Sequence, residues 1–200
     1  MTEKAAPQFA VKPPKADVTA DGIAAAVRQA GAKGPPPVHL WDPPFCGDLD
    51  IEIRRDGTWF YLGTPIGREA LVRLFASVLK LEDGKFYLVT PVEKVGIRVQ
   101  DAPFIAVDCT AEAGDLRFVT NVGDTVVAGP AHPIRVAIAA DGEPRPYLHV
   151  RRGLEARIDR KTFYRLIDLA APGAHDGEDW LGLISGGVFF PIQRMAEISG

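Results

Sequence analysis

Hydrophobic and polar residues alternate with a period of two over much of the chain beyond residue 48, which is typical of half-buried β-strands. In the middle of the chain this pattern predicts strands at residues 97–100, 104–109, 116–121, 125–128 and 134–138. The spacing changes to that of an amphipathic helix in residues 66–75 and again in residues 158–167. Strands that outnumber helices and do not alternate with them regularly predict an α+β fold with mainly antiparallel sheets.

Each helical segment belongs to a longer stretch, and the two stretches look like diverged copies of one unit. Both run from a hairpin into the helix and later into a short aromatic strand. The first copy comprises residues 53–57, 66–75 and 84–92, and the second comprises residues 150–153, 158–167 and 187–192. The sequence therefore predicts a duplicated hairpin-helix-strand unit.

The hairpin of the first copy is expected to turn at Asp56 and Gly57, a pair that is typical of two-residue turns. This turn would pair Ile53 with Phe60 on the core face. The outer face would then carry charged and aromatic side chains, namely Glu52, Arg54, Trp59 and Tyr61. Such a surface could stack a planar ligand, or a neighbouring sheet or the N-terminal arm could cover it.

The hairpin of the second copy is expected to have a three-residue loop at residues 151–153, with Gly153 in the left-handed conformation. This register pairs the apolar side chains of one face, Leu148 with Ala156 and Val150 with Leu154. The other face pairs Tyr147 with Arg157 and His149 with Glu155. Both hairpins are therefore predicted to present a charged and aromatic outer face.

The first 37 residues are rich in Ala, Pro and Lys and are expected to form an arm rather than a domain. A weakly helical segment at residues 18–30 has a narrow apolar stripe of Ile23, Val27 and Ala30, so it should need to dock on the body of the protein. Beyond the arm, residues 38–95 are expected to form the first unit and residues 96–200 the second α+β part.

The chain has 200 residues, of which 46% are hydrophobic and 24% charged, so it can bury a sizeable core. Its net charge of -3 argues against a protein that coats nucleic acid or a membrane surface. No apolar run approaches the roughly 20 residues of a membrane span, and the first residues lack a secretory apolar core. We therefore expect a cytoplasmic protein.

Charge is unevenly distributed along the second part. A basic stretch contains Arg135, Arg145, Arg151, Arg152, Arg157, Arg160, Lys161 and Arg165. An acidic stretch before it contains Asp101, Asp108, Glu112, Asp115 and Asp124. The two stretches could pair with each other, or one of them could be a site.

No catalytic motif is present. The serines lack a G-x-S-x-G context, and Cys46 and Cys109 have neither C-x-x-C spacing nor nearby histidines. The four histidines are scattered without ligand spacing, and residues 185–187 (Ser-Gly-Gly) are typical of a turn rather than a phosphate loop. No catalytic residue, metal ligand or cofactor is therefore predicted.

Two arginines, Arg68 and Arg160, occupy matching positions in the first turns of the two helices, where the helix dipole disfavours a cation by roughly 0.3–1 kcal/mol. A ligand anion held between the arginine and the helix N–H groups would compensate for this cost. An internal ion pair with an acid such as Asp101 or Asp159 would do so as well. Both possibilities stay open.

Polar residues also gather at the junction between the two copies, where pockets tend to form. The candidate ligand-binding set therefore combines the helix arginines with these junction residues: Arg68, Arg73, Thr90, Glu93, Arg98, Asp101 and Arg160.

Seven short segments carry a family resemblance: residues 38–43, 47–51, 56–59, 65–68, 71–75, 88–93 and 101–104. Because they occur in order, the chain from about residue 38 to residue 192 resembles the uncharacterised bacterial family called domain of unknown function 1285. The resemblance implies a two-part α+β fold with a repeated motif and a C-terminal half that superficially looks like a pleckstrin-homology domain. It also implies a ligand, a nucleotide-like one among the candidates, between the halves, and a role in signalling.

The leading prediction is a non-enzymatic ligand-binding or signalling module that binds an anionic small molecule at the interface between the two repeats. One alternative is a protein-interaction module that uses the charged and aromatic hairpin faces, with Arg54, Trp59 and Tyr61 as contact residues. Another is an enzyme of unfamiliar type, whose buried polar cluster a sequence cannot reveal.

Overall fold

The computed structural model describes residues 19–30, 36–140 and 142–198. Most of the predicted N-terminal arm lies outside these residues. Within it, helix α1 (Ala20–Ala30) buries Ile23, Ala24 and Val27 and contacts helix α2 (Glu69–Ser77), and a 3₁₀ turn, η1 (Val38–Leu40), leads into the body. The prediction that this segment docks on the body is therefore confirmed for Ile23 and Val27.

The first half of the molecule contains a six-stranded sheet. Its strands are β1 (Phe45–Ile53), β2 (Trp59–Tyr61), β3 (Thr64–Pro65), β4 (Leu79–Glu82), β5 (Lys85–Val89) and β6 (Lys94–Val99). They lie in the order β3-β2-β1-β6-β5-β4. The central strands β1 and β6 run parallel, and the other described pairs are antiparallel. Helix α2 follows β3 and buries Phe75 and Ala76.

The second half contains another six-stranded sheet. Its strands are β7 (Phe104–Glu112), β8 (Asp115–Thr120), β9 (Thr125–Val127), β10 (Ile134–Ile138), β11 (Pro144–Arg151) and β12 (Leu154–Ile158). Their order is β10-β11-β12-β7-β8-β9, with β12 and β7 parallel at the centre. Helix α3 (Arg160–Ile167) follows β12 directly. The strands predicted in this region are confirmed.

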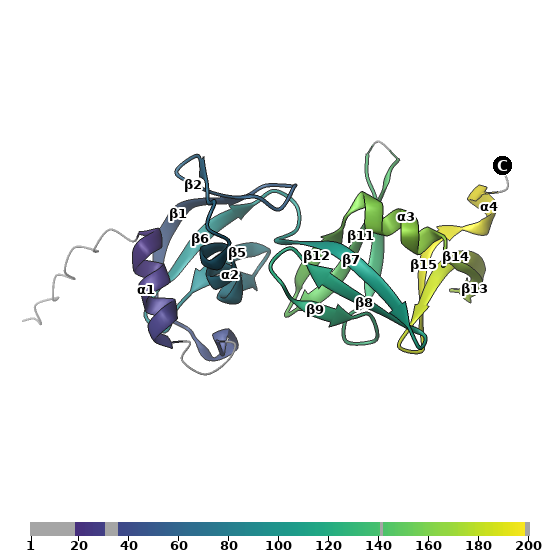
Figure 1. Cartoon of the computed structure of the whole chain (residues 1–200), viewed down its shortest axis with the longest axis horizontal. Coiled ribbons are helices and arrows are strands. Elements are labelled where there is room, and N and C mark those ends of the chain that lie inside the picture. Colours follow the sequence, from purple (N-terminus) through teal and green to yellow (C-terminus); the bar gives the residue numbers. More distant parts are fainter. Residues whose placement is uncertain (1–18, 31–35, 141, 199–200) are drawn as a thin grey trace, which may run out of the picture.

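The two sheets have the same topology. Each consists of two three-stranded meanders, and the first strand of the first meander runs parallel to the last strand of the second. The fold class is therefore confirmed as α+β, mainly antiparallel, with two similar halves that lie side by side in Figure 1. Each half contains a hairpin that leads to a helix. However, the hairpin β1–β2 begins its sheet, whereas β11–β12 ends its own.

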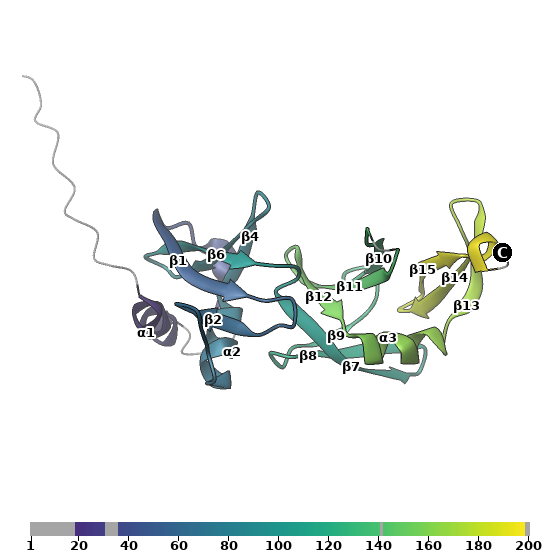
Figure 2. The same cartoon turned by 90° about the horizontal axis from the view of Figure 1, so that it is seen from above.

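A three-stranded sheet completes the second half. It comprises β13 (Ala171–His175), β14 (Glu178–Ser185) and β15 (Val188–Arg194), followed by α4 (Met195–Ile198). Figure 2 shows this sheet at the end of the molecule remote from the first half. The turn at Ser185 attaches it to the second sheet, because the buried Ser185 hydroxyl accepts from Leu116 N and donates to Ala128 O, each at 2.8 Å. The turn predicted at residues 185–187 is therefore confirmed.

The first hairpin differs from its predicted register by one residue. Ile53 pairs with Trp59 rather than with Phe60, because the loop has three residues, 55–57, and Gly57 adopts the left-handed conformation with φ of +82°. Trp59 therefore points into the core with 1% of its surface exposed. The outer face carries Phe60, and the Arg54 guanidinium carbon lies 3.6 Å from the centre of its ring.

The second hairpin largely has its predicted register. Pairs Tyr147–Arg157, Leu148–Ala156 and His149–Glu155 are confirmed. Beyond them a β-bulge places Arg151 opposite Leu154, so the predicted pairing of Val150 with Leu154 is wrong, although both side chains are buried.

The boundary predicted at residue 95 falls inside β6, which belongs entirely to the first sheet. The break in the structure is the short linker between β6 and β7. Around it the buried apolar side chains of both halves form one contiguous cluster. At the contact, a Cβ on Gly57 would lie 2.7 Å from Ile105 and 2.8 Å from the amide of Asn121, so the two halves pack closely there.

Candidate functional site

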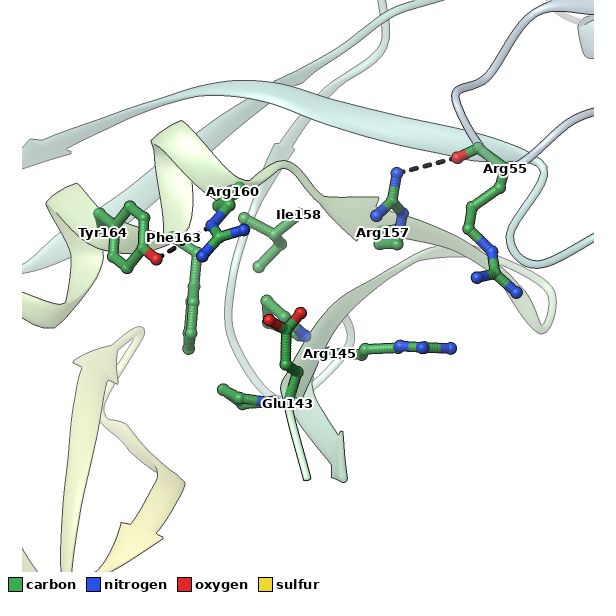
Figure 3. Close-up of a pocket in the computed structure, with 10 residues that line it drawn as sticks. Arg55, Glu143, Arg145, Arg157, Ile158, Arg160, Phe163 and Tyr164 are labelled. Atoms are coloured by element: carbon green, nitrogen blue, oxygen red, sulfur yellow. Dashed lines mark hydrogen bonds between the residues drawn. The ribbon is translucent and has the colours of Figure 1, made fainter. Parts of the chain in front are cut away.

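A cavity of about 400 Å³ lies where the first hairpin loop meets the end of β12 and the start of α3. Figure 3 shows the residues that line it, which come from both halves of the chain. They are Arg55 from the first half, and Glu143, Pro144, Arg145, Pro146, Arg157, Ile158, Arg160, Phe163 and Tyr164 from the second. Four arginines and one glutamate make the lining strongly cationic.

The local sequence explains why two of these arginines lie beside each other. Strand β12 ends at Ile158, which is buried, and helix α3 begins at Arg160. Between them Asp159 caps the helix, since its Oδ1 accepts from Thr162 N at 2.7 Å. This abrupt change from strand to helix brings Arg157 and Arg160 to the same cavity.

Arg157 also joins the two halves. Its Nη2 donates to the backbone oxygen of Arg55 at 2.8 Å, and its Nε lies 3.5 Å from Oδ2 of Asp101 in the linker. The other oxygen of Asp101 accepts from the Tyr147 hydroxyl at 2.7 Å. Burial, followed by the bond to this carboxylate, raises the pKa of Tyr147. The network ties one wall of the cavity to the linker.

Arg160 pairs with neither of the acids considered from the sequence. Its Nε donates to the Tyr164 hydroxyl at 2.9 Å, one helical turn further on, and this bond raises the pKa of the guanidinium. The predicted ion pair of Arg160 with Asp101 or Asp159 is therefore wrong, and the acid whose charge acts on this guanidinium is Glu143. The guanidinium of Arg55 makes no hydrogen bond or ion pair with a described residue.

The other predicted ligand-binding residues do not come together at this cavity. Arg68 is the exposed N-cap residue of α2 and makes no side-chain capping bond. Arg73 pairs with Glu69 at 3.2 Å beside a small cavity of about 160 Å³. Arg98 pairs with Asp50 at 2.6 Å on the outer face of the first sheet.

The remaining predicted residues have structural roles. Thr90 is fully buried, and its hydroxyl accepts from the backbone N–H groups of Val92 and Glu93 at 3.3 and 3.1 Å. These bonds hold the turn before β6. Of the predicted set, Arg160 lines the 400 Å³ cavity, and Asp101 supports its wall through Arg157.

The proposed aromatic contact surface is altered by the register of the first hairpin. Trp59 is in the core, where its ring stacks on Phe75 with the centroids 6.3 Å apart, and Tyr61 is half-buried on the same face of the sheet. Trp59 therefore cannot be a contact residue of the folded protein. Of the predicted contact residues, Arg54 lies on the outer face, beside Phe60.

The uneven charge of the second half is explained mainly by pairing between the two stretches. Arg151 pairs with Asp124, Arg157 with Asp101, and Arg165 with Asp108. The cavity residues Arg145 and Arg157 belong to this basic stretch but were not singled out from the sequence. Arg55 was missed because it follows a hairpin strand and has no sequence signal of its own.

Neither a metal site nor a membrane helix is found in the described parts of the chain. No three His, Cys, Asp or Glu side chains in residues 19–30, 36–140 and 142–198 are grouped so that they could hold a metal ion. In the same residues, no helix is long and apolar enough to cross a membrane.

Comparison with known proteins identifies the family. Two family models match consecutive parts of the chain: the N-terminal domain of DUF1285, a domain of unknown function, over residues 36–102, and the C-terminal domain of the same family over residues 103–192. The chain belongs to the DUF1285 family. The division between the two models coincides with the linker between β6 and β7.

Two solved DUF1285 structures are similar to the chain. The family protein from Silicibacter pomeroyi DSS-3 is 59% identical, with a TM-score of 0.80 over 90% of this chain and 98% of that one. The family protein from Shewanella baltica OS155 is 31% identical, with a TM-score of 0.50 over 60% of this chain and 91% of that one. No curated protein matches the chain.

Proposed function

We propose that this DUF1285 protein is a non-enzymatic signalling module that binds an anionic small molecule in the cavity between its two halves. One observation supports this most strongly: four arginines, contributed by both halves, surround a single cavity of about 400 Å³. Like charges brought together cost free energy in the empty protein, and an anion would offset that cost. Arginine also suits phosphate and carboxylate groups because its donors bind two oxygens at once.

The rest of the lining favours a ligand that carries a flat apolar part as well as an anion. Phe163 and Tyr164 on α3 and two prolines on β11 provide ring and apolar surface. Aromatic side chains and arginine planes both stack on bases. A nucleotide-like ligand would combine the two chemistries, with its phosphate on the arginines and its base on these rings.

The position of the cavity suggests how binding would be sensed. A ligand in contact with both Arg55 and Arg160 would join the first hairpin loop to the start of α3. It would also lie beside the bond between Arg157 and the backbone of Arg55. Binding would therefore favour one arrangement of the two halves over others, which is what a signalling role requires.

Calorimetric titration of the full chain with nucleoside monophosphates, and separately with inorganic phosphate, tests the proposal. We expect binding of at least one nucleotide to weaken about tenfold or more in Arg55→Ala and in Arg160→Ala, because each removes a charged hydrogen bond to the anion. Arg98→Ala is the matched control, since Arg98 is an exposed arginine paired with Asp50 away from the cavity.

Each outcome of the titration contradicts a different part of the proposal. Equal weakening by all three variants would mean that the total charge of the protein matters and not this cavity. Absence of binding by every nucleotide would overturn the nucleotide-like ligand, and absence of binding by phosphate as well would overturn the anion site.

A further inference from the structure

The tip of the second hairpin, which we call the 151–153 loop, comprises Arg151 at the end of β11 and the turn residues Arg152 and Gly153. All three residues reach across to the first half. Arg151 Nη2 donates to the backbone oxygen of Ala76 at 2.9 Å, at the end of α2. Arg152 Nη2 lies 2.8 Å from Nδ1 of His39. A Cβ on Gly153 would lie 3.3 Å from a methyl group of Leu81, so the backbone packs against β4 there. The loop is thus a principal contact between the halves.

Two hydrogen bonds of this loop use a histidine nitrogen as the acceptor. A guanidinium can only donate, so Nδ1 of His39 accepts from Arg152. The backbone N–H of Gly153 donates to Nε2 of His149 at 3.0 Å. His149 Nδ1 lies 3.0 Å from the carbonyl oxygen of Ala131, which can only accept, so this nitrogen carries the hydrogen. Both rings must therefore be neutral, and the tautomer of each is fixed.

Protonation of either histidine ring removes the nitrogen lone pair that accepts the hydrogen bond. A protonated His149 would direct an N–H at the N–H of Gly153, and a protonated His39 would direct one at the guanidinium of Arg152. Histidine is the side chain whose charge ordinarily changes between about pH 5 and pH 8. The neighbouring His132 differs, because its Nδ1 lies 3.2 Å from the backbone oxygen of His149 and already acts as a donor. Its protonation leaves that bond intact.

Charged groups face both rings. Opposite His149 on β12 lies Glu155, and Arg135 binds both of its carboxylate oxygens. His132 stacks on His149 with the ring centres 5.9 Å apart, and the Arg151–Asp124 pair flanks the loop. Arg152 is the charged group in contact with His39. Strand β4, which packs on the turn that carries His39, contributes Lys80 and Glu82.

We propose that the 151–153 loop is a pH-sensitive contact between the two halves, which His39 and His149 hold together only while both are neutral. As the pH falls, the loop loses both acceptors, Nδ1 of His39 for Arg152 and Nε2 of His149 for Gly153. The loop then loses its bond to His39 in the first half and its own internal support at Gly153. This inference goes beyond the anion site and does not depend on any ligand.

The loop is also connected to the cavity. Strand β12 begins at Leu154, directly after the loop, and carries Arg157, whose bond to the backbone of Arg55 closes one wall. Loosening of residues 151–153 would therefore change the position of Arg157, which lies three residues beyond Leu154 in the same strand, and with it the cavity wall.

Nitrogen NMR of the histidine rings in the full, ligand-free chain tests the proposal directly. At about pH 8 we expect His149 in the tautomer with hydrogen on Nδ1 and His39 in the tautomer with hydrogen on Nε2. As the pH falls to about 5, the amide of Gly153 should lose about fivefold in protection from exchange, corrected for the intrinsic rate, because one backbone hydrogen bond is lost. Either opposite tautomer, or constant protection of Gly153, would overturn the proposal.

Variants test the role of the two rings. The double variant His39→Gln, His149→Gln keeps a side-chain oxygen that can accept but takes up no proton in this range. We expect the pH dependence of the Gly153 amide to disappear in it. His175→Gln is the matched control, because His175 lies in the C-terminal sheet beside Asp176 and Trp180. Unchanged pH dependence in the double variant, or its loss in the control, would contradict the proposal. If the double variant does not fold, the tautomers measured for the wild-type histidine rings still test the proposal.

Discussion

The two six-stranded sheets share one topology but differ in where the helix is inserted. In the first sheet α2 lies between the two meanders, and in the second α3 follows the last central strand. Consequently Arg68 begins a helix at the exposed edge of its sheet, whereas Arg160 begins one beside the central parallel pair. Two arginines that match in sequence thus have different surroundings.

This difference indicates why arginines surround the cavity in the second half, whereas the cavity of about 550 Å³ on the counterpart strands β5 and β6 has Asp48 and Lys85 as its charged lining residues. Strand β12 leads straight into α3, and the first hairpin loop of the other half packs against this junction. Strand β6, the topological counterpart of β12, leads instead into the linker. The cluster of arginines around the cavity is therefore a product of the connection between halves rather than of the repeated sheet.

The largest expected loss of unfolding free energy comes from substitutions of buried aromatic residues on equivalent strands of the two sheets. Trp59 on β2 and Phe118 on β8 occupy equivalent strands, and both side chains are almost completely buried. Trp59→Ala should lower the free energy of unfolding by about 3–5 kcal/mol, and Phe118→Ala by a similar amount, because each leaves a large cavity. Urea unfolding followed by circular dichroism measures both.

The neighbour of Trp59 provides the control. Phe60 lies on the outer face under Arg54, so Phe60→Ala should cost about 1 kcal/mol or less. If Phe60→Ala is the more damaging change, the register of the first hairpin described above is wrong.

Two cysteines also lie on equivalent strands, Cys46 on β1 and Cys109 on β7. Burial raises the pKa of the Cys109 thiol from 9.0 to about 11. In a Cys46→Ser background, alkylation of Cys109 at about pH 8 should be about a hundredfold slower in the folded chain than in urea, because the thiolate is the reactive form. Equal rates in the two states would show that the β7 position is not shielded.

Substitution of two glycines distinguishes the effect of the contact between halves from the effect of backbone conformation. Gly57 and Gly84 both have positive φ, +82° and +76°, but a Cβ on Gly57 would meet Ile105 and Asn121, whereas one on Gly84 would meet nothing within 4 Å. Gly57→Ala should therefore destabilise the protein by about 1–3 kcal/mol more than Gly84→Ala. Equal losses of unfolding free energy would mean that the contact is looser than described.

Much of the fold could be predicted from sequence periodicity, because the strands of both sheets bury one face and alternate accordingly. The register of the first hairpin could not. Asp56 and Gly57 suit a two-residue turn as well as a three-residue loop that ends in a left-handed glycine, and the choice moves Trp59 from one face to the other. In the second hairpin the burial of Leu148 and Ala156 selected the right pairing for residues 147–149, whereas the bulge that places Arg151 opposite Leu154 was not predicted.

The candidate site was harder to predict, since its residues meet only through packing between the halves. Sequence matching aligned the hairpin β1–β2 with β11–β12, although the sheet topology relates β11–β12 to β5–β6. The helix arginines gave one correct lining residue, Arg160. Arg55 and Arg157 come together through a side-chain bond to a backbone oxygen, which leaves no pattern in either segment.

The smallest predicted effect concerns the outer faces of the two halves. Lys80 and Lys94 hold the Glu82 carboxylate at 2.6 and 2.8 Å and lower its pKa, and Arg165 lowers the pKa of Asp108 in the second half. A carboxylate with a lowered pKa in the folded state stabilises the protein above its unfolded pKa and loses this effect as the pH falls through the folded value. Glu82→Gln should therefore reduce the unfolding free energy by less than about 1 kcal/mol at neutral pH, since the group is partly exposed to solvent, and this loss should shrink as the pH falls through the folded pKa of Glu82. Asp108→Asn, whose group is fully exposed, serves as the control, and urea unfolding at neutral and at acidic pH should detect a smaller pH-dependent difference for Asp108→Asn than for Glu82→Gln. A larger loss of unfolding free energy for Asp108→Asn than for Glu82→Gln would contradict the prediction that the less exposed carboxylate contributes more.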